Sequence, residues 1–517
     1  ASIFASNIGS EHLIGLAGAG ASSGMAMAHW EIQGWMILIL GWVFVPFYSR
    51  SMVYTMPEFL ERRYNPQSRT ILSVISLVSY VLTKVAVTVY AGGLVFQQVF
   101  GIKELWGIDF FWIAAIGLVV LTAIYTIFGG MKSVLYTSVL QTPILLLGSL
   151  IILVLGFKEL GGWDEMMRVC GAVTVNDYGD TMTNLIRSND DANFPWLGAL
   201  IGSAIIGFWY WCTDQFIVQR VLSGKNEKEA RRGTIFGAYL KLLPVFLFLI
   251  PGMIAFALHQ KYIGAGGEGF LPMLANGTAN ADAAFPTLVA KLLPAGVKGL
   301  VVCGILAALM SSLASLFNSS AMLFTIDFYK RFRPETPEKK LVGIGQVATV
   351  VIVILGILWI PIMRSVGDVL YTYLQDVQSV LAPGIAAAFL LGVCWKRTSA
   401  QGGMWGLISG MVIGLTRLGA KVYYSNAGEV ADSTFKYLFY DMNWLFFCGW
   451  MFLFCMIVVI VVSLTTKAPT AEKIQGLVFG TATKEQKAAT RVSWDHWDII
   501  HTVIILSITA AFYWYFW

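Results

Sequence analysis

Long apolar runs follow one another along most of this chain. Runs of about 20 residues with few charges are long enough to cross the hydrocarbon core of a bilayer as helices. Only 13% of the residues are charged and 57% are hydrophobic, whereas a typical soluble chain has about a quarter of its residues charged. In lipid, backbone polar groups must be satisfied within the protein, which favours helices. The chain is therefore predicted to be an all-α polytopic membrane protein.

Thirteen membrane spans are expected, and the first is expected to be incomplete because the sequence is apolar from residue 1. The predicted spans are 1–21, 24–49, 70–99, 109–129, 132–157, 195–219, 232–258, 297–328, 341–363, 367–395, 399–420, 443–465 and 497–517.

Lysine and arginine alternate between two sets of loops. The richer set includes Arg62, Arg63, Arg231, Arg331 and Lys340. Cytoplasmic loops carry an excess of basic residues. This set is therefore expected in the cytoplasm, and the polar loops 158–194 and 259–296 and the C-terminus are expected outside.

Polar residues interrupt the first span, and they are Asn7, Gly9, Ser10, Glu11 and His12. The span over 195–219 is interrupted in a similar way by glycines and by WYWCTDQ at 209–215. Paired broken helices in two halves of a chain are typical of inverted-repeat transporters. We expect a five-plus-five inverted-repeat transporter fold with discontinuous first and sixth core helices.

The domain organisation follows from this pairing. Residues 1–157 are expected to form the first repeat with core helices 1–5, and 195–397 the second with core helices 6–10. An external loop, 158–194, separates them, and 398–517 would supply peripheral helices 11–13.

Ionisable side chains lie within the predicted spans at Glu31, Lys84 and Lys241. Each costs at least ~2.5–3.5 kcal/mol in hydrocarbon, so such groups usually face a polar interior. The favoured interpretation is that they line a pocket for a polar solute. The alternative is a structural ion pair between Glu31 and a lysine.

Tyr371, Gln375 and Gln378 are spaced i, i+4, i+7 and so share one helix face. Glutamines on such a face hydrogen-bond either a hydroxylated solute or a neighbouring helix.

A second stripe contains Ala308, Ser311, Ser312 and Ser315. Small residues at this spacing permit close helix packing. Beside a broken first span, their hydroxyls also suit a monovalent cation, which prefers oxygen ligands.

No nucleotide-binding motif accompanies these features, because Gly224-Lys225 is followed by Asn226 rather than serine or threonine. No HExxH or CxxC pattern is present either. Uphill movement of a solute would therefore draw on an ion gradient rather than ATP, and no enzyme activity is expected.

Six segments resemble the sodium/glucose cotransporters of the solute:sodium symporter family. They are FASNIGSEHLIGLAG (4–18), TMPEFLERRY (55–64), IFGGMKSVLYT (127–137), WYWCTDQFIVQR (209–220), YLKLLPVF (239–246) and MSSLASLFNSS (310–320). The family has fourteen helices with both ends outside, so this chain would lack the leading helix and the start of the next.

The resemblance implies roles for individual residues. The implied sugar-binding residues are Asn7, His12, Glu31, Tyr210, Trp211, Lys241 and Gln375. The implied outer gate consists of Leu16, Trp30 and Tyr371, and Tyr210 would gate the inside. The implied sodium ligands are backbone oxygens of Ala5, Ile8 and Ala308 and hydroxyls of Ser311 and Ser312.

Two departures from the family affect stoichiometry. Members that carry two sodium ions have an aspartate and a threonine where this chain has Ser138 and Ala314. One sodium per sugar is therefore expected. Thr88 also stands where animal members have an aspartate, so the role of Lys84 is left open.

The expected function is sodium-coupled symport of a hexose of the glucose or galactose type into the cell by alternating access. A myo-inositol or other polyol symporter, and a sugar sensor or uniporter without coupling, are the alternatives. The short link 466–496 and the scarcity of external cysteines favour a bacterial inner membrane over an animal source.

Overall fold

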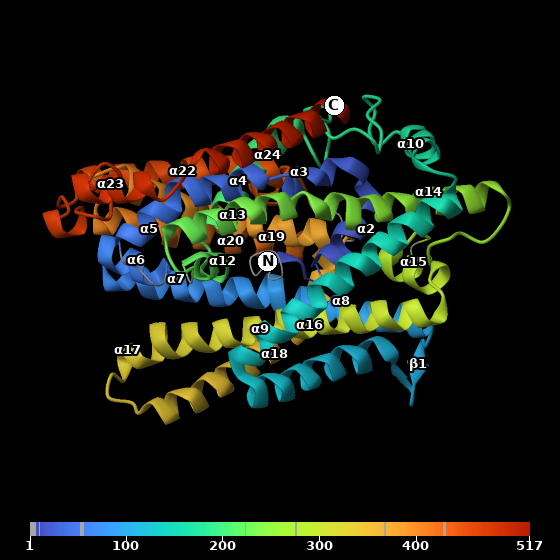
Figure 1. Ribbon diagram of the computed structural model, residues 1–517, viewed down its shortest axis with the longest axis horizontal. Coiled ribbons are helices and arrows are strands. Elements are labelled where there is room, and N and C mark those ends of the chain that lie inside the picture. Colours follow the sequence, from blue (N-terminus) through green and yellow to red (C-terminus); the bar gives the residue numbers. More distant parts are fainter. Residues whose placement is uncertain are drawn as a thin grey trace.

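The computed structural model describes residues 7–9, 11–51, 56–222, 224–274, 277–366, 369–427 and 431–517, and of these the side chains at 125, 127–142, 219 and 364–366 are not described. Figure 1 shows the long helices lying side by side along one direction. The basic segments α17 and α23 lie at one end of this bundle, and α10 and β1 lie at the other. The two sets of loops expected from charge thus lie at opposite ends.

The first half of the chain contains a string of short helical segments followed by longer helices. Its elements are η1 (Glu11–Leu16), α2 (Ala17–Ser23), η2 (Gly24–Met27), α3 (Ala28–Glu31), α4 (Gly34–Ile39), η3 (Leu40–Phe44), α5 (Val45–Ser51), α6 (Met56–Arg63), α7 (Pro66–Ser79), η4 (Tyr80–Val85), α8 (Ala86–Phe100), β1 (Glu104–Leu105), β2 (Ile108–Asp109), α9 (Phe110–Leu160) and α10 (Trp163–Gly171).

The middle of the chain begins after the external loop. Its elements are α11 (Trp196–Gly207), η5 (Phe208–Thr213), α12 (Gln215–Leu222), α13 (Glu227–Lys241), η6 (Val245–Leu249), α14 (Ile250–Gly264), η7 (Ala281–Ala283), α15 (Ala284–Leu292), α16 (Ala295–Met322), η8 (Leu323–Tyr329), α17 (Lys330–Phe332), α18 (Glu338–Val366) and α19 (Leu370–Cys394).

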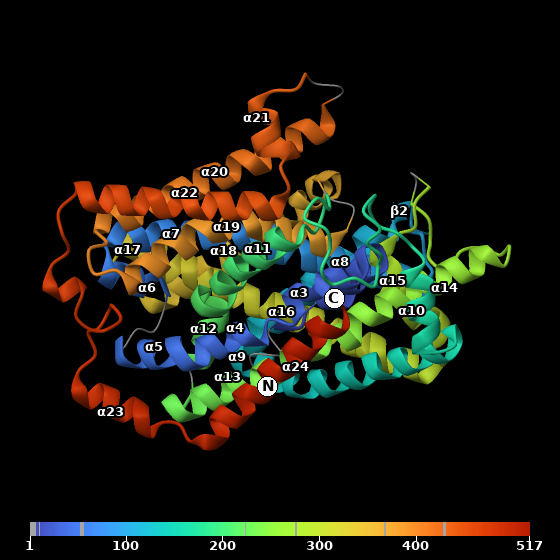
Figure 2. The same cartoon turned by 90° about the horizontal axis from the view of Figure 1, so that it is seen from above.

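The last part of the chain covers the bundle from outside. Its elements are α20 (Ala400–Asn426), α21 (Thr434–Lys436), η9 (Tyr437–Asp441), α22 (Trp444–Thr465), η10 (Ala471–Lys473), α23 (Lys484–Val492) and α24 (His496–Tyr515). Figure 2 shows α20 and α22 on one side of the bundle, and the chain passing through α23 to α24 on the other.

Polar residues begin several helices, as expected for groups that satisfy unpaired N–H donors. The side chain of Asn65 accepts from the Ser68 amide at 2.8 Å, and Pro66 occupies the first turn of α7. The side chains of Asn226 and Ser399 cap α13 and α20 in the same way. The β1–β2 hairpin turns through Trp106 and Gly107, both at positive φ, the conformation of a two-residue type I′ turn.

Ten of the described helical stretches are long and apolar enough to cross a membrane. They do not match the thirteen predicted spans one for one. Residues 11–21 of the first span and all of 24–49 fall within one stretch, Glu11–Ser51, and spans 109–129 and 132–157 lie along the single helix α9. Span 399–420 corresponds to the helix α20, which is not among the ten.

Both predicted interruptions are present. After Asn7 the chain leaves helical geometry at Ile8 and Gly9 and resumes at η1. Between η5 and α12, Asp214 is extended, with φ −74° and ψ 126°. Its carboxylate accepts from the Phe216 amide at 3.1 Å and so begins α12. The fold is therefore an all-α membrane transporter fold with two discontinuous helices, as predicted.

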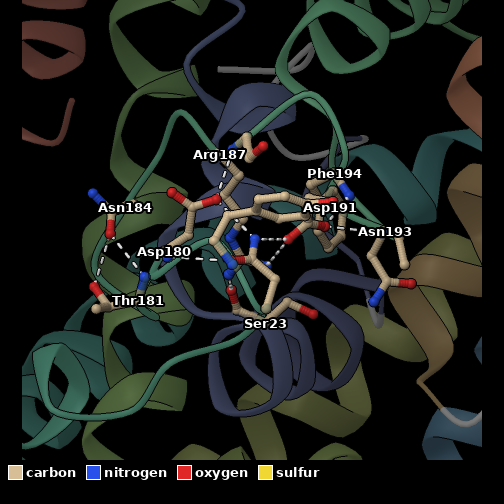
Figure 3. Close-up of polar contacts among 12 residues, drawn as sticks. Ser23, Asp180, Thr181, Asn184, Arg187, Asp191, Asn193 and Phe194 are labelled. Atoms are coloured by element: carbon tan, nitrogen blue, oxygen red, sulfur yellow. Dashed lines mark hydrogen bonds and ion pairs between the residues drawn. The ribbon is translucent and has the colours of Figure 1, made fainter.

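Residues 180–194 form a cluster of polar contacts beside Ser23 at the end of α2, which Figure 3 shows. Arg187 is almost fully buried and donates to the Ser23 carbonyl oxygen. Its guanidinium also lies 3.8 Å from the Asp191 carboxylate and 5.6 Å from the centre of the Phe194 ring. Burial lowers the pKa of Arg187, while Asp191 and Asp180 act in the opposite direction. These contacts of Arg187 hold the loop against the first discontinuous helix.

Candidate functional site

A polar cavity lies between the two helix breaks. It has a volume of about 70 Å³, below the range of about 300–1,000 Å³ usual for small-molecule sites, so the lining side chains leave little free space in this conformation. The predicted binding residues that line it are Asn7, His12, Tyr210, Trp211, Lys241 and Gln375. The cavity is also lined by Trp30, Tyr371, Gln378 and Ser312. Residues far apart in the sequence thus form one chamber.

Three π-helical turns contribute to the wall of this cavity. Such turns widen an α-helix locally, leave its hydrogen bonding irregular, and are frequent at functional sites. His12 comes from η1, Lys84 from η4, and Tyr210 and Trp211 from η5. The irregular turns therefore coincide with the polar part of the wall.

Glu31, predicted to bind the sugar, does not itself line the cavity but lies behind its wall, in contact with lining residues, and none of its surface is exposed. Its carboxylate accepts from Lys241 Nζ at 2.7 Å and from the Tyr371 hydroxyl at 2.5 Å, and it lies 3.4 Å from His12 Nε2. A buried carboxylate is tolerated only with partners of this kind. The ion pair between Glu31 and a lysine, one of two interpretations of the sequence, is present with Lys241, and that lysine also lines the cavity.

Tyr210 and Trp211 form an aromatic part of the cavity wall, and polar contacts hold them in place. Asn7 Nδ2 donates to the Tyr210 hydroxyl at 3.2 Å, which links the first helix break to the second. The rings of Tyr210 and Trp211 meet edge to face at 85°. Lys241 Nζ lies 5.6 Å from the centre of the Trp211 ring. Aromatic faces and hydrogen-bonding groups therefore stand side by side, an arrangement suited to a solute with both apolar faces and hydroxyls.

Several buried polar atoms of the lining have no hydrogen-bond partner among the described residues. They are Asn7 Oδ1, His12 Nδ1, Trp30 Nε1 and Gln375 Oε1. Buried polar groups are almost always hydrogen-bonded, so such a cluster indicates a missing polar ligand or water. The unpaired atoms include both donors and acceptors, which matches a hydroxylated solute.

Lys84 and Asp214 form a second ion pair beside the cavity, with Lys84 Nζ 3.2 Å from Asp214 Oδ2. The ammonium also lies 4.0 Å from the centre of the Phe216 ring and 5.6 Å from that of Tyr210. The pair therefore ties η4 to the break in the second discontinuous helix, directly beside Tyr210.

Of the predicted sodium ligands that the structure describes, Ile8 belongs to the first helix break and Ser312 lies beside it. A methyl group added at Gly9 would lie 3.0 Å from Ser312 Oγ and 2.6 Å from a Glu11 carboxylate oxygen. Ile8, Ala308 and Ser311 are also buried. Ala5 lies outside the described residues. Glu11 adds a carboxylate beside the same glycine, Gly9.

The predicted gate residues occupy different surroundings. Trp30 and Tyr371 line the cavity, whereas Leu16 is fully buried and does not. Trp30 stacks on Trp444 at 5.4 Å between ring centres and contacts Phe194 edge to face. Trp30 of the predicted gate therefore packs directly against Phe194, at the end of loop 158–194.

Sequence reasoning missed Gln33 and Asp214. Gln33 lines the cavity and donates to the Ser203 carbonyl oxygen at 2.9 Å. It stands two residues after Glu31 within an apolar span, which was an available signal. Asp214 lies in the recognised WYWCTDQ segment, but its pairing with Lys84 depends on tertiary structure.

Comparisons with known proteins identify the family of the chain. The sequence pattern of the Sodium:solute symporter family matches residues 1–410. The sodium/myo-inositol cotransporter 2 of Homo sapiens is 37% identical over 494 residues, covering 93% of this chain and 72% of that protein. The sodium/glucose cotransporter 1 of Ovis aries is 38% identical over 485 residues, covering 90% and 72%.

The fold is shared with a solved structure, the substrate-bound outward-open state of a Na⁺-coupled sialic acid symporter. Its TM-score is 0.68 at 22% sequence identity, over 91% of this chain and 89% of that one. The family match shows that the protein is embedded in a membrane, moves a solute by symport and uses sodium as the coupling ion. The chain therefore belongs to the sodium:solute symporter family.

Proposed function

We propose that this protein carries a hexose of the glucose or galactose type into the cell together with one sodium ion. The observation that carries the proposal is the set of unpaired donors and acceptors of Asn7, His12, Trp30 and Gln375 around one cavity. A pyranose offers hydroxyls to these atoms and an apolar face to Tyr210. The named sodium/glucose relative supports the same solute class.

Sodium is proposed to bind between the first helix break and α16. Its ligands would be the backbone oxygens of Ala5, Ile8 and Ala308 and the hydroxyls of Ser311 and Ser312. Sodium there would hold Asn7 in the geometry that receives the sugar, since Asn7 and Gly9 belong to the same break. Coupling follows if sodium binds the sugar-competent state better than the other state.

Transport is proposed to proceed by alternating access. Trp30 and Tyr371 would close the site toward the outside, and Tyr210 toward the inside. The Asn7–Tyr210 hydrogen bond joins the two helix breaks, so it would break when Tyr210 moves to open the inner gate. The membrane is proposed to be a bacterial inner membrane, with the loop 158–194 and the C-terminus outside.

A cyclic polyol is the second candidate, because a sodium/myo-inositol cotransporter is as similar to this chain as the glucose cotransporter. Binding of radiolabelled glucose to the purified protein in sodium, with galactose and myo-inositol as competitors, separates the two. The hexose proposal expects galactose to displace glucose at a concentration at least tenfold below that of myo-inositol. The reverse order would make a polyol the substrate.

Gln375→Ala tests the site within the same assay. It removes a side chain with an unpaired buried oxygen in the lining, so glucose affinity should fall about tenfold or more. Ser379→Ala, one turn further along α19, is the matched control. Its hydroxyl donates to the Asp376 carbonyl oxygen and the residue does not line the cavity. Equal affinities for the two variants would refute the assignment of Gln375.

A further inference from the structure

A second, apolar groove lies on the outside of the bundle, separate from the polar cavity. It has a volume of about 790 Å³ and is formed by α7, η4, η8 and α18. Its walls include Leu77, Val81, Phe324, Val347 and Leu355. The polar transport site shares none of its lining residues with this groove.

One stripe of α18 forms the length of the groove. Lys340, Gly343, Val347, Val351 and Leu355 follow one another at intervals of three or four residues, so they lie on one helix face. Fifteen helical residues extend over about 22 Å, which exceeds half of the ~30 Å hydrocarbon thickness of a bilayer. Val347 is 65% exposed. The groove is thus open on the lipid side and long enough for an acyl chain in one leaflet.

The charge at the mouth of the groove is positive. Lys340 is the one charged residue of its lining, and it is exposed. The adjoining segment also exposes Lys330, Arg331, Arg333 and Lys339, against Glu335 and Glu338. This end of the molecule carries the richer set of basic loops, which is expected to face the cytoplasm. The structure records no ion pair for Lys340 with another described residue.

Gly343 keeps the mouth open. A methyl group added there would have no atom within 4 Å. Because Gly343 lies one turn from Lys340, a head group bound by the lysine has a clear path to the apolar stripe. Along α18 a positive charge at Lys340 is followed by an apolar surface, which matches a lipid with an anionic head group and an apolar tail.

We propose that this groove is a binding site for an anionic phospholipid, with its phosphate at Lys340 and one acyl chain against α18. Basic residues at the cytoplasmic end of a helix groove attract anionic head groups in this way. The site borders the transport machinery. Leu82 lines the groove, and the next two residues, Thr83 and Lys84, line the polar cavity.

The test is native mass spectrometry of the full chain released from nanodiscs that contain phosphatidylglycerol or phosphatidylcholine. The wild type should retain one phosphatidylglycerol more strongly than phosphatidylcholine. Lys340→Gln should weaken that preference about fivefold, since a lysine near an anionic surface contributes on that scale. Lys339→Gln removes the same charge one residue away and outside the lining, so it should keep the preference within twofold.

Gly343→Leu tests the groove itself, because its side chain would fill the open mouth. It should reduce retention of phosphatidylglycerol at least fivefold, and Gly299→Leu, at another open glycine on α16, should not. Retention of phosphatidylglycerol unchanged by both Lys340→Gln and Gly343→Leu would overturn the proposal. So would equal retention of phosphatidylcholine by the wild type, which would make the groove an ordinary lipid-facing surface.

Discussion

The carboxylate of Glu31 joins three side chains of the cavity, which makes it the residue whose loss has the widest effect. Lys241, Tyr371 and His12 all meet it within 3.4 Å. Removing one partner of a buried ion pair leaves the other charge uncompensated, at a cost of about 3–5 kcal/mol. Glu31 and Lys241 should therefore depend on each other in their contribution to the stability of the protein.

We expect Glu31→Gln and Lys241→Met each to lower the unfolding temperature of the purified protein by several degrees. The double variant should lose less than the sum of the two single variants, because it leaves no buried charge unpaired. Glu165→Gln offers a control at the exposed pair with Arg168, where little change is expected. Strictly additive losses would show that the pair does not act as a unit.

The sodium dependence of transport tests the residues beside the first helix break. Ser312→Ala and Glu11→Gln should each raise the sodium concentration for half-maximal transport by about threefold or more, since each removes an oxygen or a charge beside Gly9. Ser320→Ala, a buried serine two turns further along α16, is the control. An unchanged sodium requirement in Ser312→Ala would remove that serine from the site.

Part of the site was predictable at the residue scale. The polar residues of the broken spans and the 371–375–378 face lie together around one cavity, as the spacing suggested. The pairing of Lys84 with Asp214 was not predictable, because it depends on how η4 packs against a break 130 residues later. The carboxylate of Glu11 beside Ser312 was missed for the same reason.

At the scale of elements, the two helix breaks followed from polar and glycine residues inside apolar runs. The π-helical turns did not, because apolar patterning does not distinguish a π turn from a regular one in a buried helix. Span boundaries were also imperfect. The short segments between Glu11 and Ser51 form one continuous stretch, where two separate spans were expected.

The loop 158–194 is held to the first discontinuous helix by several hydrogen bonds. The Met25 amide donates to the Met182 carbonyl oxygen at 2.8 Å, and His29 Nε2 lies 3.0 Å from the Leu185 carbonyl oxygen. Arg187 adds its bond to Ser23. The loop therefore clamps the C-terminal end of α2 and the segment that leads to Glu31.

Arg187→Met should loosen this clamp while keeping side-chain length. Hydrogen–deuterium exchange should become at least tenfold faster for amides in 180–194 and for Met25, because the Arg187 guanidinium holds this segment in its buried position. Arg168→Met, in the exposed pair on α10, is the control. Exchange rates equal to those of the wild type in both variants would show that the contacts of Arg187 do not hold the loop in place.

For the whole molecule, the proposed single cation site predicts the electrical stoichiometry. At Ser138 and Ala314 the chain lacks the carboxylate and the threonine hydroxyl of members that carry two sodium ions, and Ala314 is fully buried. The reversal potential of glucose-coupled current in proteoliposomes should therefore correspond to one charge per sugar. A ratio near two would require a second cation site elsewhere in the chain.

The central claim is that sodium and a hexose move together. The measurement that tests it most directly is uptake of radiolabelled glucose into proteoliposomes, with and without an inward sodium gradient. The account predicts accumulation above the external concentration only with the gradient, and loss of accumulation when a sodium ionophore dissipates it. Glucose flux that is downhill and equal in sodium and in potassium would contradict coupling.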